Sequence, residues 1–167
     1  KGVFMFTNLI KRTTALAASV FLVAGLLTAC SIPLPNGSGE CTFTVDYPHG
    51  STKVAGFMDG KGKAKCVVTS GALTNLRIET RLQRWSGSAW ITMTGSTVTT
   101  TINTVKSGVT YTGVSGFVIC QSGTFRTQSR GSAQLDGKPA QSLQWQTTNT
   151  KKGVKNPCTK PTQIVTV

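Results

Sequence analysis

Apolar and polar residues alternate along much of the chain, which is the period of a β-strand with one buried face. The clearest run is LRIETRLQRW, residues 76–85. Alternate positions of this run form a mainly apolar face, made of Leu76, Ile78, Thr80 and Leu82. The positions between them form a polar face, made of Arg77, Glu79, Arg81 and Gln83. Beyond residue 40 no segment repeats apolar residues every three or four positions, so the pattern predicts an all-β domain.

Two hairpins are predicted where turn residues separate extended runs. SGSA (86–89) lies between LRIETRLQRW and WITMT, so residues 76–94 are expected to form the first hairpin. Asp136 and Gly137 suit the positive φ angles of a tight turn and predict the second hairpin, with arms in 116–135 and 138–148. A threonine-rich run, 96–113, suits one or two exposed strands. Together these short strands predict an antiparallel β-sandwich.

The first 29 residues follow a different pattern, that of a secretory signal. Residues 13–29 contain no charged side chain, and their apolar run ALAASVFLVAGLL follows the basic pair Lys11 and Arg12. The run is shorter than the roughly 20 residues that a membrane-spanning helix needs. We therefore expect a helical signal peptide at 1–29, with Met5 as its start.

The apolar run ends in LTAC (27–30), which resembles the lipobox of bacterial lipoproteins. The resemblance implies cleavage before Cys30 and acylation of its thiol. Two or three acyl chains, at about 0.8 kcal/mol per buried methylene, would make a stable anchor at the extracytoplasmic face of the cell membrane. SIPLPNGSGE (31–40) is then expected to form a flexible tether, with the β-sandwich at 41–167. An ordinary signal peptide, with Cys30 in a disulfide, is the alternative.

Four further cysteines follow Cys30, namely Cys41, Cys66, Cys120 and Cys158. An even number in an exported chain predicts two disulfides, and three connectivities are open. No two of these cysteines have C-x-x-C spacing and the chain has a single histidine, so neither a metal site nor a cofactor is expected.

Cys66 in KAKCVV and Cys120 in GFVIC lie in segments that have the character of buried strands. The arrangement resembles an immunoglobulin-type domain, in which a disulfide joins the facing sheets and packs on a tryptophan. The resemblance implies a bond between Cys66 and Cys120, which leaves Cys41 to pair with Cys158.

A tryptophan, Trp85 or Trp90, is implied by the same resemblance to pack against that disulfide. The stretches RLQRWSGSAW and CQSGTFRTQSRGSAQLDGK are also similar to small exported β-sandwich proteins of actinobacteria and their phages. This second resemblance covers roughly residues 81–138 and implies no particular activity.

Basic residues greatly outnumber acidic ones, 18 to five, for a net charge of +13. Three of the basic residues precede Cys30, so the remainder of the chain carries +10. Such a surface attracts polyanions, which outside the cytoplasm are chiefly anionic lipid head groups, phosphate-bearing envelope polymers and free DNA.

Two lysine groups are the candidate anion contacts. Lys61, Lys63 and Lys65 alternate in KGKAKC and are expected to share one face of a strand. The second group lies near the C-terminus and comprises Lys151, Lys152 and Lys155. Neither group contains an aromatic residue on which a base could stack, so specific nucleic-acid recognition is not expected.

Few residues suit catalysis. A glycosidase-like carboxylate pair would have to come from Asp46, Asp59 and Glu79, and no motif supports it. His49 in DYPHG is expected in an exposed loop, and GVSG (113–116) lacks the G-x-S-x-G pattern of a serine hydrolase.

The sequence therefore leads to the hypothesis of a membrane-anchored, extracytoplasmic lipoprotein that binds an envelope polymer or a surface protein without catalysing a reaction. One alternative is a prophage-encoded surface lipoprotein that excludes later phages. The other is a small extracytoplasmic hydrolase.

Overall fold

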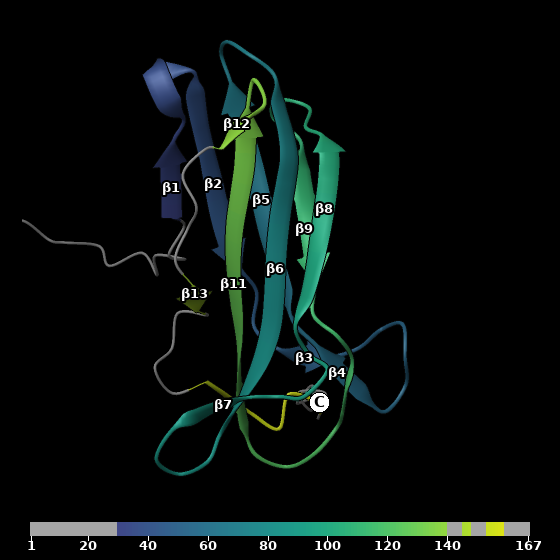
Figure 1. Cartoon of the computed structure of the whole chain (residues 1–167). Helices are drawn as coiled ribbons and strands as arrows, with labels where there is room; N and C mark the ends of the chain where they lie inside the picture. Colours follow the sequence, from purple (N-terminus) through teal and green to yellow (C-terminus); the bar gives the residue numbers. More distant parts are fainter. Residues whose placement is uncertain (1–29, 140–144, 148–152, 159–167) are drawn as a thin grey trace, which may run out of the picture.

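The computed structural model describes residues 30–139, 145–147 and 153–158, and these residues form an antiparallel all-β fold (Figure 1). The predicted fold class is confirmed. The expected signal peptide, 1–29, lies outside the described residues, as do Lys151 and Lys152. The elements, in chain order, are β1 (Cys30–Pro33), the 3-10 turn η1 (Pro35–Gly37), β2 (Gly39–Val45), β3 (His49–Gly50), β4 (Phe57–Asp59), β5 (Lys61–Val68), β6 (Leu73–Trp85), β7 (Trp90–Thr92), β8 (Val98–Thr104), β9 (Thr110–Val114), β10 (Val118–Ile119), β11 (Thr124–Leu135), β12 (Lys138–Pro139), β13 (Gln146–Thr147) and β14 (Val154–Lys155).

Two sheets form the layers of a sandwich. The first has the order β1-β2-β5-β9. The second has the order β12-β11-β6-β7, with β8 also paired to β6 and with β13 and β14 paired to β11. Figure 1 shows β11 and β6 side by side along the length of the molecule, and both contact β5 of the first sheet. A small third sheet, β10-β4-β3, closes one end.

The core lies between the two large sheets, and the alternation in the sequence explains it. On β6, the predicted apolar face of Leu76, Ile78, Thr80 and Leu82 is completely buried. On β5 the inward positions are small, because a Cβ added at Gly62 would overlap Ser129 of the facing sheet. Gly131 of β11 is packed in the same way against the ring of Phe43. Close approach of the layers therefore depends on small residues at matched positions.

Both predicted hairpins have the expected turns. Trp85 of β6 pairs with Trp90 of β7, and the amide of Ser86 donates to the Ala89 carbonyl at 2.9 Å. Leu135 of β11 pairs with Lys138 of β12. The turn between them is Asp136–Gly137, with φ angles of 50° and 73°.

The expectation of a flexible tether at 31–40 is wrong. Residues 30–33 form β1, which pairs with β2 so that Ile32 lies opposite Cys41. Ile32 and Leu34 belong to the core, with 7% and 4% of their surfaces exposed. Burial of these two apolar side chains outweighs the flexibility that the glycines suggested. Pro33 is tolerated because β1 is an edge strand.

The structure contains the two expected disulfides, but with different partners from those implied by the immunoglobulin resemblance. Cys41 is bonded to Cys66, its register partner on the neighbouring strand. Cys120 is bonded to Cys158. The implied Cys66–Cys120 bond is wrong because Cys120 follows β10, which belongs to the small end sheet and not to a layer facing β5.

The tryptophan expected to pack on a disulfide is also absent from the described core. Trp85 is 39% exposed, and its ring packs on Trp90 with 5.3 Å between centroids. Trp85 occupies one of the outward positions of β6, so its ring points away from the space between the sheets.

Candidate anion-binding face

Four arginines are spread over the outer face of the sheet that contains β6 and β11. Arg77 and Arg81 occupy outward positions of β6, and Arg126 and Arg130 occupy outward positions of β11. The antiparallel register places Arg81 opposite Gln128, midway between the two arginines of β11. The four side chains therefore alternate between the strands in the order Arg126, Arg81, Arg130, Arg77, and we call this set the arginine ladder.

The backbone positions of the four arginines are evenly spaced. Each step joins a residue on one strand to the diagonal neighbour of its register partner, and such neighbours lie about 7–8 Å apart. Trp145 gives an independent limit, because its ring centroid is 3.8 Å from Cζ of Arg81 and 4.6 Å from Cζ of Arg130. These two guanidinium carbons thus lie no more than 8.4 Å apart, the sum of the two distances.

Three of the guanidinium groups are held by cross-strand hydrogen bonds. Nε of Arg126 donates to Oε1 of Gln83 at 2.7 Å, and Nε of Arg81 donates to Oε1 of Gln128 at 2.9 Å. Both glutamines are buried, at 6% and 7% exposure. Nε of Arg130 donates to Oε2 of Glu79 at 2.6 Å. The two glutamine side chains are neutral amides, so they orient Arg81 and Arg126 without cancelling their charge.

Two tryptophans restrict the same cations. The Trp145 ring lies against Arg81 and Arg130, and the Trp90 ring centroid is 4.4 Å from Cζ of Arg126. These are cation–π distances. The aromatic rings therefore contact the same three arginines, Arg81, Arg126 and Arg130, that the cross-strand hydrogen bonds orient.

The charges on the arginine ladder repel one another. Burial lowers the pKa of Arg81, an effect that Glu79 opposes and Arg130 reinforces. Burial, followed by the charge of Arg81, lowers the pKa of Arg126. Arginine stays protonated near neutral pH, so an anion placed between these side chains would relieve their repulsion.

The predicted lysine face lies on the opposite side of the sandwich. Lys61, Lys63 and Lys65 point outward from β5, as their alternation predicts. Nζ of Lys63 lies 2.7 Å from Oδ2 of Asp46, which neutralises part of this face. Lys155 is exposed on β14, which pairs with β11, so the structure does not bring it together with the lysines of β5.

The three carboxylates considered for catalysis are each paired with a basic side chain. Asp46 follows β2 and pairs with Lys63 of the first sheet, and Glu79 pairs with Arg130 on the second sheet. Asp59 is buried in the end sheet. His49 is not in a loop as expected. It belongs to β3, and its Nε2 lies 3.2 Å from Oδ1 of Asp59.

Ser115 of the GVSG stretch is buried with 3% exposure, and its Oγ accepts a hydrogen bond from the Gly60 amide at 3.0 Å. Its hydroxyl oxygen therefore supports the turn between β4 and β5. Cys30, at the start of β1, is half-buried and forms no disulfide.

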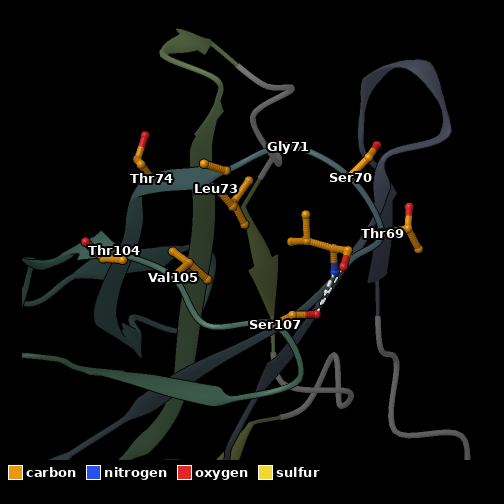
Figure 2. A pocket seen from close by; sticks show the side chains of 10 residues that line it. Thr69, Ser70, Gly71, Leu73, Thr74, Thr104, Val105 and Ser107 are labelled. Atoms are coloured by element: carbon orange, nitrogen blue, oxygen red, sulfur yellow. Dashed lines mark hydrogen bonds between the residues drawn. The ribbon is translucent and has the colours of Figure 1, made fainter.

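An open cleft of about 470 Å³ lies at the far end of the sandwich from the small sheet (Figure 2). Its floor includes Leu73 and Val105, and several hydroxyl groups surround it. The Ser107 hydroxyl is already engaged, since its Oγ accepts from the Val68 amide at 2.9 Å. The lining has no charged side chain, so this cleft does not share the chemistry of the arginine ladder.

Two further observations hold for the described part of the chain. No three His, Cys, Asp or Glu residues there come together as a group able to hold a metal ion. Nor does that part contain a helix with the length and apolarity that crossing a membrane requires.

Sequence reasoning missed the arginine ladder although its residues are visible. RIETR and RTQSR each place two arginines four positions apart, on one face of a strand. The four arginines form one site because of the strand register. It places Arg81 opposite Gln128, two residues from both Arg126 and Arg130.

Comparison of the chain with protein-family models, with curated proteins and with solved structures found no match.

Proposed function

We propose that this protein is a non-enzymatic binding module, held at the outer face of the cell membrane, whose arginine ladder binds an anionic polymer of the cell envelope. The observation that carries the proposal is the ladder itself. Four arginines share one sheet face with a single carboxylate, Glu79, along the stretch in which β6 and β11 are paired. Guanidinium groups bind phosphate and carboxylate through paired hydrogen bonds.

A polymer fits this face better than a folded protein partner does. The Cα positions of the four arginines recur at equal steps along the direction of the strands. A chain with one charge per repeat can meet each step in turn. A folded protein would have to present matching acids on a flat surface of its own.

The membrane anchor in this proposal is a lipid on the thiol of Cys30. Because β1 begins at that residue and Ile32 is already part of the core, such a lipid would hold the sandwich directly at the membrane surface. Two disulfides suit an extracytoplasmic location, where the environment is oxidising.

The proposal includes no reaction, because each of the three carboxylates considered for catalysis, Asp46, Asp59 and Glu79, is already paired with a basic side chain. General acid–base hydrolysis of a glycosidic bond requires two carboxyl groups on either side of that bond. Here two of the carboxylates are instead paired with basic side chains on opposite faces of the sandwich.

The test is sedimentation of the full chain with envelope fractions of its host, in detergent, across a salt series. The variant R81Q/R126Q/R130Q removes three charges from the arginine ladder. The matched control K61Q/K63Q/K65Q removes three charges from the opposite face. We expect the arginine variant to lose most of the binding and the lysine variant to retain it. Equal losses would show that only net charge matters and would refute the proposed site.

A further inference from the structure

The regular spacing of the arginine ladder restricts what it can bind. Arg126 and Arg130 are four residues apart on one strand, as are Arg77 and Arg81 on the other. Each pair therefore spans about 13 Å. A single small anion could contact only one or two neighbouring arginines, whereas a linear chain could contact all four.

The positioning of the guanidinium groups favours recognition of anionic groups over sugar or base rings. Trp145 lies against Arg81 and Arg130, and Trp90 against both Arg126 and Trp85. A ring that already lies against a cation is a poor platform for a nucleobase or a sugar. The arginine ladder therefore offers a ligand the positive charge and the paired N–H donors of its guanidinium groups.

We infer that the arginine ladder binds a linear phosphodiester chain whose phosphates are joined by small alcohol units, with the chain lying parallel to β6 and β11 and one phosphate at each arginine. This inference rests on the proposed function and specifies its ligand. A phosphodiester keeps one negative charge per repeat, and its two non-bridging oxygens can accept the paired hydrogen bonds of a guanidinium group. Short alcohol linkers are flexible, so successive phosphates can adjust to steps of about 7–8 Å.

The direction of the chain follows from the register. The next cation after each arginine is always on the other strand and two residues further along. A chain that crossed the strands at right angles would meet one arginine and then leave the ladder. Only a chain along the strands passes all four, in the order Arg126, Arg81, Arg130, Arg77.

The experiment uses the full chain in detergent and glycerol phosphate oligomers with one to eight phosphates. Tryptophan fluorescence reports binding, because Trp90 and Trp145 contact the arginines. We expect affinity to rise about tenfold for each phosphate up to four and much less beyond that. The slope of log K against log salt should likewise steepen by about 0.7–0.9 for each phosphate up to four.

Single variants test the assignment of one phosphate to each arginine. R77Q changes an exposed position at the end of the arginine ladder. It should reduce the salt slope by about one, and affinity should stop rising at three phosphates instead of four. R130K keeps the charge but removes the fork, so it should weaken binding and leave the salt slope unchanged. The lysine variant K61Q/K63Q/K65Q should behave as the wild type does. Unchanged circular dichroism spectra would show that each variant is folded.

The outcomes separate this inference from the proposed function. Affinity that does not grow beyond one phosphate would overturn it, as would tighter binding of an oligonucleotide with the same number of phosphates. If envelope binding depends on the arginines while glycerol phosphate oligomers do not bind, the ligand assignment fails and the proposed function stands. If envelope binding does not depend on the arginines, both fail.

Discussion

Arg81 lies directly opposite Gln128 in the register of β6 and β11, and its Nε donates to the amide oxygen of that glutamine at 2.9 Å. The same relationship joins Arg126 to Gln83 one row away, with the strands exchanged. In both pairs a buried neutral side chain orients a charged one. The positive charge is therefore fixed in position and left available, which is the basis for the anion-binding function proposed here.

Glu79 is the exception among the three acceptors, since it carries a charge that competes with an anionic ligand for Arg130. Replacing it with glutamine keeps an acceptor for Nε and removes the negative charge. We expect Glu79→Gln to tighten polyanion binding by about two- to fivefold, the size of a partly exposed ion pair. Titration of the wild type and the variant at one salt concentration measures this. Weaker binding in the variant would contradict the account, because it would mean that Glu79 contributes to the ligand site.

Trp145 is expected to act on binding through the arginines that it contacts. Trp145→Leu leaves the net charge unchanged but removes the ring that restricts Arg81 and Arg130. Since a cation–π contact at an exposed site contributes about 0.5–1 kcal/mol, polyanion affinity should fall by about two- to fivefold. The salt slope should stay the same, because no charge is lost. A change in the slope would argue against a purely positioning role.

The disulfide pairing can be tested by peptide mapping without reduction. We expect peptides that link Cys41 to Cys66 and Cys120 to Cys158. The double variant C41S/C66S removes the bond between β2 and β5 and should lower the free energy of unfolding by about 2–4 kcal/mol. Denaturant titration measures the change. Linked Cys66 and Cys120 peptides would instead restore the immunoglobulin-type arrangement.

Gly131 tests the packing of the two layers. A Cβ at this position would overlap the ring of Phe43 on the facing sheet. Gly131→Ala is therefore expected to destabilise the fold by about 1–3 kcal/mol, the usual effect of overpacking. Ser132→Ala, at the next position on the outer face, is the control and should change the free energy of unfolding little. Equal stability of the two variants would mean that the layers are further apart than described.

The proposed lipid anchor predicts the fate of a thiol variant. Cys30→Ser removes the acceptor for acylation, so the protein should leave the membrane fraction when cells are fractionated. Because Cys30 forms no disulfide and does not belong to the buried core, the released protein should still be folded. Membrane retention equal to that of the wild type would refute the anchor.

Parts of this fold can be predicted from the sequence because their signals lie within short stretches of the chain. The buried face of β6 follows from strict alternation over Leu76, Ile78, Thr80 and Leu82. The tight turn follows from the backbone preferences of Asp136 and Gly137. Both signals are contained within a few neighbouring residues, so no knowledge of the partner strand is needed.

The features that the sequence did not predict depend on contacts between residues far apart in the chain. The arginine ladder depends on which residue of β11 lies opposite Arg81, and a shift of one residue would turn the whole face into the core. The cysteine pairing depends on Cys41 and Cys66 being register partners. The composition of 31–40 suggested a tether, because proline and glycine content does not reveal that Ile32 and Leu34 find a place in the core.

The most direct test of the central claim is to observe the arginine side chains while an envelope polymer is added. The Nε protons of Arg81, Arg126 and Arg130 are hydrogen-bonded to Gln128, Gln83 and Glu79, so their signals can be followed by nitrogen–proton NMR of the full chain in detergent. We predict that these three signals shift together as an anionic envelope polymer is titrated, and that the ammonium signals of Lys61, Lys63 and Lys65 stay in place. Shifts confined to the lysines, or no shifts at saturating polymer, would contradict the assignment of the arginine ladder as the binding site.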